Sequence, residues 1–340
     1  MASADERVRI AGADGRTREV SLDAYLDAHA IEASERDGNA WIKRFRCALV
    51  DGVPLRDRLT YRGDSFWWFV ELYLHKQRTV VSAYRTIHAL ETVVASERPT
   101  KISTDGAALV RLLVPQVARR HHIWTDGRDA TAALRRSRLR LLARSRFHTI
   151  AALADRARPG AALAPPADPV EVAAFVHSAF WNRDQDEEGY VGPVLRALEE
   201  RVPRGRLGLV GLGPRTNFRV RRWRHRLAEF NDPHARALPL VPIESLAGWR
   251  SIRPSMSTWR DRNRVLGALL RSDDLRQAAI LDGYDIWPAI RNDLVGVSHL
   301  QLPWSARSMD EAGAALDALR PRIVLTYAEA GGWGRALALE

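Results

Sequence analysis

The chain ends with the stretch Pro321-Arg-Ile-Val-Leu-Thr-Tyr-Ala-Glu-Ala-Gly-Gly-Trp-Gly-Arg-Ala-Leu-Ala-Leu-Glu340. Residues 323–327 are β-branched, apolar or aromatic, which predicts a buried strand, and the glycines that follow predict a tight loop. A helix over 335–340 should come next. A strand, a glycine-rich turn and a helix N-terminus form the place where α/β sheets hold anionic ligands. Because only six residues follow Gly334, we expect the chain to be part of a longer protein.

A rhythm of apolar runs and helical patterns leads up to this stretch. Strands are predicted at 171–178, 206–210, 237–243 and 323–327, and helices at 189–200, 219–229, 257–281 and 308–319. Such alternation predicts an α/β fold in which helices cover both faces of a parallel sheet.

The first half of the chain has a different pattern. Asp14-Gly15 between short apolar runs predicts a hairpin, and the helix that starts at Ser21 should be interrupted at 37–39. A long helix is predicted over 65–96, and a strand and a helix over 100–120. We identify no short internal repeat. The predicted organisation is an α/β segment over 1–157 with a basic helical insertion at 125–157, a proline-rich linker at 158–169, and the βα segment 170–340.

Composition limits the class of protein. The 340 residues carry a formal charge of +11, and 46% of them are hydrophobic, which is enough for a large core. A basic chain favours acidic partners such as nucleic acid, an anionic membrane surface, or phosphorylated and nucleotide-bearing substrates. Cys47 is the only cysteine, so no intrachain disulfide can form. Neither a signal peptide nor a membrane span is predicted, and we expect a cytoplasmic protein.

The basic segment Arg135–Arg146 has three interpretations. Its leucines and arginines interleave around the helical wheel instead of separating into two faces. We rank a solvated helix first, a contact with an anionic membrane second, and nucleic-acid binding last.

The ends of the predicted strands are where chemistry is expected, because ligands collect beyond the carboxyl ends of parallel strands. Five strand ends are expected to deliver their residues to the same edge of the sheet: Asp105-Gly106, His177-Ser178, Gly211-Leu-Gly213, Glu244-Ser245 and Tyr327-Ala-Glu329. Imidazole titrates near neutral pH, so His177 is suited to act as a general base on a hydroxyl; the alternative is a core histidine. Glu329 has three possible roles: a general base, a ligand of sugar hydroxyls, or a residue that caps a helix or forms an ion pair.

Other motifs are weak. The glycines at 331–334 suit a phosphate, although the segment lacks the lysine and the serine or threonine of a Walker loop. Gly211-Leu-Gly213 lacks the third glycine of a dinucleotide fingerprint, which argues against NAD or FAD. Asp184-Gln-Asp186 has the spacing of a divalent-metal pair, but such triplets are common by chance in acidic loops. Two interpretations are open for a group of mainly aromatic residues, which are part of the core or form the rim of a sugar-binding cleft: Trp67, Trp68, Tyr73 and His75.

Three stretches resemble a known family. They are Tyr61-Arg-Gly-Asp-Ser-Phe-Trp-Trp-Phe-Val-Glu-Leu-Tyr-Leu-His-Lys76, Val176-His-Ser-Ala-Phe-Trp181 with Glu188-Gly-Tyr-Val-Gly-Pro-Val-Leu195, and Tyr327-Ala-Glu-Ala-Gly-Gly-Trp-Gly-Arg-Ala336. Together they are similar to the amino-terminal half of bacterial surface-carbohydrate glycosyltransferase-like proteins of GT-B architecture. The similarity is patchy and extends from about Trp41 to the end.

The resemblance implies two Rossmann-like domains, of which the carboxyl-terminal one holds the nucleotide-sugar and the other the acceptor, without a metal or other cofactor. This chain would be the acceptor-side half of an enzyme of surface polysaccharide biosynthesis that transfers a sugar to the hydroxyl of a glycan or lipid-linked acceptor. Expressed alone, it should bind the acceptor or a membrane without turnover. It would be cytoplasmic, either free or peripheral at the inner membrane.

The resemblance also suggests roles for individual residues. His177 or Glu329 would deprotonate the acceptor, a role that we assign from their positions at strand ends. The residues expected near the diphosphate are Gly331, Gly332, Gly334 and Arg335, and those expected to line the acceptor side are Trp67, Trp68 and Tyr190. Two rival hypotheses remain: a metal-dependent GT-A transferase that uses Asp184 and Asp186, and a basic protein without catalysis that binds nucleic acid or a membrane surface.

Overall fold

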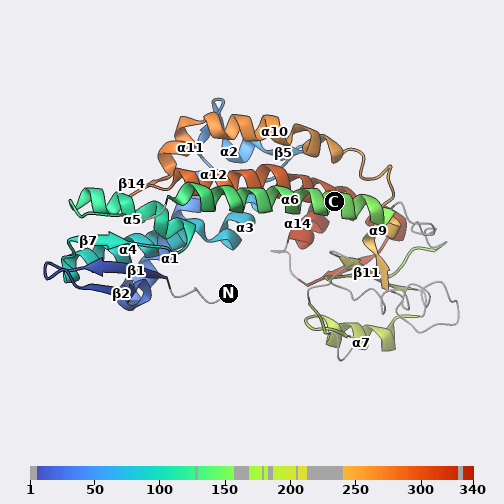
Figure 1. Cartoon of the computed structure of the whole chain (residues 1–340). Helices are drawn as coiled ribbons and strands as arrows, with labels where there is room; N and C mark the ends of the chain where they lie inside the picture. The colour runs from blue at the N-terminus through green and yellow to red at the C-terminus, as the bar shows by residue number, and fades with distance from the viewer. Residues whose placement is uncertain are drawn as a thin grey trace. The chain divides into compact units, whose positions relative to one another are not determined.

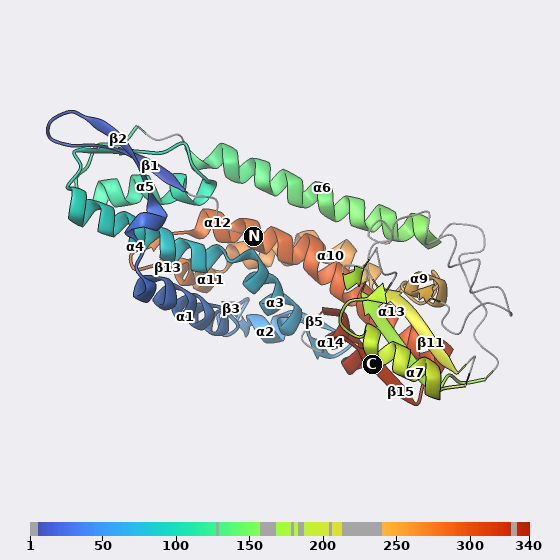
Figure 2. The same cartoon turned by 90° about the horizontal axis from the view of Figure 1, so that it is seen from below.

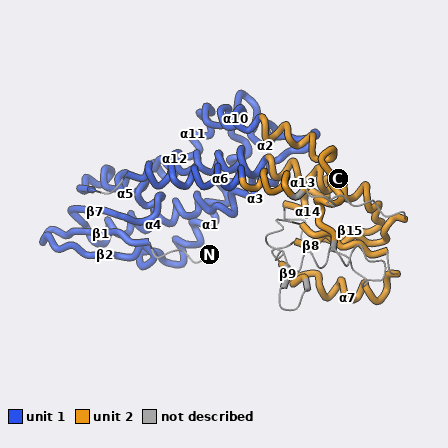
Figure 3. The backbone as a smooth tube through the Cα atoms, turned by 45° about the vertical axis from the view of Figure 1, so that its right-hand side comes forward, with its two compact units in different colours: residues 1–146, 261–302 blue, residues 147–260, 303–340 orange. Residues whose placement is uncertain are grey.

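The computed structural model describes residues 6–126, 129–156, 168–177, 180–182, 187–203, 206–212, 240–327 and 332–340 (Figure 1). The chain divides into two compact units, which Figure 3 distinguishes by colour. Unit 1 comprises 1–146 and 261–302, and unit 2 comprises 147–260 and 303–340. The units therefore do not follow the predicted linker at 158–169, because the chain returns to unit 1 after residue 260.

Unit 2 is built on a four-stranded parallel sheet, which confirms the predicted α/β class. Its strands are β8 (Val172–His177), β11 (Leu207–Leu212), β12 (Leu240–Pro242) and β15 (Ile323–Thr326), arranged in the order β12-β11-β8-β15. Each neighbouring pair is parallel, with Val172 to His177 opposite Leu207 to Leu212. Numbered along the chain, the four strands stand in the order 3-2-1-4, which is compatible with a Rossmann-like fold.

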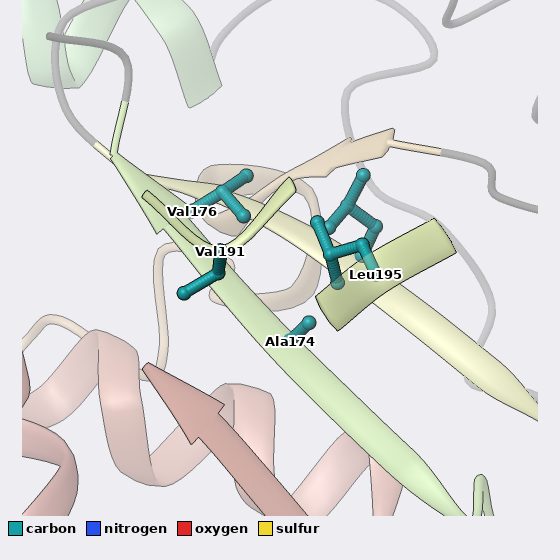
Figure 4. Packing of buried hydrophobic residues seen from close by; sticks show 5 residues of the cluster. Ala174, Val176, Val191 and Leu195 are labelled. Atoms are coloured by element: carbon teal, nitrogen blue, oxygen red, sulfur yellow. The ribbon is translucent and has the colours of Figure 1, made fainter. Parts of the chain in front are cut away.

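Helices and a short hairpin complete unit 2. The hairpin consists of β9 (Trp181–Asn182) and β10 (Glu187–Glu188), and the helices are α7 (Gly192–Arg201), α9 (Ile243–Leu246), most of α13 (Leu302–Leu319) and α14 (Gly332–Leu339). Figure 4 shows Val191 and Leu195 packed against Ala174 and Val176 of β8, in a cluster that also includes Leu209. The predicted helix at 219–229 lies outside the described residues.

One feature of unit 2 contradicts a prediction from the sequence, and a second was not predicted. The run at 323–327 was predicted to be a buried strand, but β15 ends the described sheet on one side and leaves Ile323 57% exposed. Arg156 and Glu311 form an ion pair with side chains that are 1% and 2% exposed. The Arg156 guanidinium also donates to the carbonyls of Ala247 (2.9 Å) and Ala152 (3.0 Å), so its charge is well satisfied.

Unit 1 is mainly helical, with a small antiparallel sheet in the order β2-β1-β7. The strands are β1 (Arg7–Ala11), β2 (Thr17–Ser21) and β7 (Lys101–Ser103), so the hairpin predicted at Asp14-Gly15 is confirmed. The helical segments are η1 (Leu22–Tyr25), α1 (Ala28–Phe45), α2 (Leu55–Arg58), α3 (Trp67–Gln77), α4 (Thr79–Glu97), α5 (Ala108–Arg120), α6 (Ala130–Arg156), α10 (Met256–Arg271), α11 (Asp273–Ala278), α12 (Trp287–Gly296) and the π-helix η3 (Val297–Gln301). Helices α6 and α10 continue into unit 2.

Three predictions about helices were wrong. The single helix at 65–96 is two helices, because Arg78 adopts a left-handed conformation (φ 58°) between α3 and α4. The helix at 257–281 is likewise divided into α10 and α11. The helix predicted to start at Ser21 begins at Ala28 as α1 and continues through 37–39 without interruption, and Gly38 is buried beside Val81 of α4. A Cβ on Gly38 would lie 2.5 Å from Cγ2 of Val81, so this position requires glycine for packing.

The structure also reveals a repeat that the sequence analysis missed. Three hairpin segments share one pattern: Ala48-Leu-Val-Asp-Gly-Val-Pro-Leu55, Leu59-Thr-Tyr-Arg-Gly-Asp-Ser-Phe66 and Ala279-Ile-Leu-Asp-Gly-Tyr-Asp-Ile286. Their strands are β3 (Leu49–Val50) with β4 (Val53–Pro54), β5 (Thr60–Tyr61) with β6 (Asp64–Ser65), and β13 (Ile280–Leu281) with β14 (Tyr284–Asp285).

Each hairpin turns on two residues with positive φ and leads directly into a helix. The central pairs are Asp51-Gly52, Arg62-Gly63 and Asp282-Gly283, which is the signature of type I′ turns. In all three, the N–H of the last residue donates to the carbonyl of the first, at 2.8 to 2.9 Å. Helices α2, α3 and α12 start at these points, so the repeat fixes three helix starts in unit 1.

Candidate functional site at the carboxyl edge of the parallel sheet

The strand order of unit 2 reverses between β8 and β15. β8 comes first along the chain and has the next strand, β11, on one side and the last strand, β15, on the other. In open α/β sheets, ligands bind outside the carboxyl ends of the strands at such a switch point. The residues at or just after the ends of these two strands are His177 and Tyr327.

Four rings meet at this edge, and we call them the edge cluster: His177, Phe180, Tyr190 and Tyr327. The His177 ring lies 5.9 Å from Tyr327 and 5.7 Å from Phe180, measured between centroids. Phe180 in turn contacts Tyr327 at 4.9 Å and Tyr190 at 4.6 Å, both edge to face. His177 is half-buried, whereas Tyr190 is 68% exposed. The cluster thus offers a histidine and an accessible aromatic face side by side.

A buried carboxylate lies beside the cluster. Glu188 is 1% exposed, and its Oε2 accepts the backbone N–H groups of Tyr190 (2.7 Å) and Val191. Its Oε1 has no hydrogen-bond partner among the described residues. Burial raises the pKa of the Tyr327 phenol, and the charge of Glu188 raises it further. The phenol therefore stays protonated at neutral pH and remains a hydrogen-bond donor.

Helix α14 begins shortly after Tyr327. Gly332, Trp333 and Gly334 in its first turn are buried, and Arg335 is half-buried. The first N–H groups of a helix have no partner within it, so a helix N-terminus attracts anions. Trp333 packs edge to face on Trp304 of α13 at 6.0 Å. The edge cluster therefore combines a histidine with aromatic rings, and a helix start follows along the chain; residues 328–331 between β15 and α14 lie outside the described part of the chain.

The predicted site residues have different outcomes. His177, Tyr190 and Tyr327 come together at one edge, and Gly332, Gly334 and Arg335 belong to the helix that follows β15. Glu329, Gly331, Asp184 and Asp186 lie outside the described residues.

The other predicted site residues belong to unit 1. Trp67 is 7% exposed, and its indole N–H donates to Glu71 at 2.6 Å, as in a core residue. Trp68 is 40% exposed on the same helix. Asp105-Gly106 follows β7 of the antiparallel sheet, so the prediction that it shares the edge with His177 was wrong.

Sequence reasoning missed Phe180 and Glu188 as parts of the site. Both residues lie in the stretches that carry the family resemblance, but no role followed from it, and a buried carboxylate is not expected at Glu188 because an acidic segment precedes it. Within the described residues, no group of three or more His, Cys, Asp or Glu side chains is arranged to hold a metal ion, and no helix is long and apolar enough to cross a membrane.

Comparisons of the chain with protein-family models, curated proteins and solved structures find no match. The geometry of the edge and the chemistry of its residues are therefore the basis for assigning a function.

Proposed function

We propose that the chain is the acceptor-side part of a glycosyltransferase of surface polysaccharide biosynthesis, with GT-B architecture. In this proposal a sugar passes from a nucleotide-activated donor to an acceptor hydroxyl at the carboxyl edge of unit 2. The observation that carries it is the reversal of strand order at β8 and β15, with the edge cluster at the ends of these two strands.

In this proposal each residue of the edge has a separate role in the transfer. His177 accepts the proton of the acceptor hydroxyl, because imidazole is basic near neutral pH and the residue lies at a strand end. Tyr190 and Phe180 offer ring faces and edges of the kind that pack on the apolar faces of sugars. The start of α14 and Arg335 attract the diphosphate of the donor.

The test measures binding and transfer separately. Calorimetry with nucleotide-sugars, glycans and polyprenyl-phosphate-linked sugars should identify an acceptor that binds the chain. Release of nucleoside diphosphate by the full gene product then measures transfer. His177→Ala should lower turnover by on the order of a hundredfold or more and change the acceptor Kd only slightly. His29→Ala, at an exposed position of α1, is the matched control and should behave as wild type.

Two outcomes would contradict the proposal. Wild-type turnover in His177→Ala would remove the base assignment, and a chain that binds neither nucleotide-sugars nor acceptors would remove the function itself.

A second candidate function, contact with an anionic membrane, is favoured by α6. No acidic residue occurs between Asp129 and Asp155, and Leu139, Phe147 and Ile150 are 56%, 59% and 65% exposed. At 3.6 residues per turn these three side chains project within roughly 80° of the helix circumference. Exposed apolar side chains among arginines are typical of helices that lie at anionic bilayer surfaces.

Vesicle sedimentation tests this second candidate. The chain should sediment with phosphatidylglycerol vesicles and not with phosphatidylcholine vesicles, and Phe147→Ser with Ile150→Ser should reduce the bound fraction. Val194→Ser, on an exposed position of α7, is the control. Equal retention of the double variant and the wild type would contradict a role for α6.

A further inference from the structure

Unit 1 contains a cavity of about 250 Å³ that no part of the proposed transfer reaction uses. It lies among α6, α10, α12 and the π-helix η3, and Figure 2 shows α6 running along α12. Four aliphatic side chains form one part of its wall, and Arg138, Arg291, Asn263 and His299 form the polar part. The cavity is thus amphiphilic, with positive charge on its polar side.

The two arginines of this cavity are half-buried, and among the described residues neither has the counter-charge that a desolvated cation needs. Nε of Arg138 donates to Oδ1 of Asn292 (3.2 Å), whose amide nitrogen is anchored on the carbonyl of Leu134 (2.9 Å). No carboxylate of the described residues pairs with Arg138 or Arg291. Burial lowers the pKa of Arg138, and repulsion from Arg291 lowers it further. Two guanidinium groups in one partly buried cavity favour an anion between them, because it would relieve both desolvation and repulsion.

The remaining polar wall is held in place around the arginines. His299 is 8% exposed, and its ring nitrogens lie 2.9 Å from the Ser298 hydroxyl and 3.1 Å from Oδ1 of Asn263. Burial lowers the pKa of His299, and the nearby Arg262 and Arg146 add to this, so the ring is neutral at pH 7. With Oδ1 turned to His299, the amide N–H groups of Asn263 have no partner among the described residues. η3 is a π-helix, a form often found at functional sites.

We propose that this cavity binds a phosphate monoester that carries an apolar ester group. Arg138 and Arg291 bind the phosphate oxygens, to which guanidinium groups are geometrically matched, and Asn263 adds a neutral donor. The aliphatic wall takes the ester group. The volume lies below the range of about 300–1,000 Å³ that is usual for drug-sized ligands, which favours a small group. The same chemistry is presented by a soluble alkyl phosphate and by the headgroup region of a phosphatidic acid lipid, and the inference does not depend on the transferase proposal.

Calorimetry of the whole chain with inorganic phosphate and n-butyl phosphate tests the site. Butyl phosphate should bind more tightly, by about fourfold for each methylene that the aliphatic wall buries. Arg138→Gln and Arg291→Gln should each weaken binding by on the order of tenfold or more. Arg135→Gln is the matched control, since Arg135 is exposed on the same helix and lies outside the cavity.

Vesicles containing phosphatidic acid or phosphatidylglycerol identify the source of the ligand. If the ligand is a lipid, the chain should be retained on phosphatidic acid vesicles, and Arg291→Gln should lose this retention while its retention on phosphatidylglycerol vesicles stays unchanged. If the chain binds butyl phosphate but is not retained in this way, the ligand is soluble. Absence of binding to every probe would overturn the proposal, as would equal affinity in wild type, Arg138→Gln and Arg291→Gln. If one glutamine variant fails to fold, the butyl phosphate affinity of the other variant tests the proposal. The rise in Tm that butyl phosphate should cause in the wild type is a second test.

Discussion

Asp293 on α12 should make the stability of unit 1 depend on pH. The residue is 7% exposed, and burial raises the pKa of its carboxyl to about 7 from 3.8. The Thr79 side chain donates a hydrogen bond that lowers the pKa only partly. The neighbouring Tyr73 hydroxyl is buried without a hydrogen-bond partner among the described residues. The folded protein therefore holds a proton on Asp293 at pH values where the unfolded chain has released it.

The sign and size of the effect follow from linkage. Because the folded state binds more protons between the two pKa values, stability should fall as pH rises from about 4 to about 7 and then level off. A shift of roughly three units corresponds to about 4 kcal/mol in total, at about 1.4 kcal/mol per unit. Between pH 5 and pH 8 the expected loss is about 2.5 kcal/mol, or a fall in Tm of roughly 5 to 10 °C.

Asp293→Asn isolates this contribution because asparagine keeps the shape and cannot ionise. Thermal unfolding of wild type and variant should be followed by circular dichroism from pH 5 to pH 8. Other titrating groups contribute equally to both proteins, so the variant should gain stability relative to wild type as pH rises. Glu32→Gln, at an exposed position of α1, should show no such difference. Parallel pH profiles for Asp293→Asn and wild type would refute the reasoning.

Two further predictions concern packing and a buried charge pair. Gly38→Ala should destabilise the protein by about 1 to 3 kcal/mol, because its Cβ would overlap Val81 of α4. Gly267→Ala, which meets only the end of a flexible arginine, should instead stabilise it by up to about 1 kcal/mol, and equal urea midpoints for both variants would argue against the packing role. Glu311→Gln should cost about 3 to 5 kcal/mol, since Arg156 would remain buried without a counter-charge; a loss below about 1 kcal/mol in urea unfolding would contradict this.

The sequence by itself determined most of the local elements. The runs at 172–177, 207–212 and 323–326 form strands, and 108–120 and 192–201 form helices, close to where apolar periodicity predicts them. These signals are readable because a strand or helix depends on the spacing of side chains within a few turns. The placement of His177 at a strand end followed from the same local pattern.

Tertiary structure decided which of these elements meet. The strand at 101–103 looks like a neighbour of His177 in a βα pattern, yet it pairs with β1 in another sheet. Asp293 and Arg138 are unremarkable in the sequence, and only packing with distant helices makes one a buried acid and the other a cation facing Arg291. Burial and charge at a residue are sums over neighbours that are far away along the chain, so no local pattern contains them.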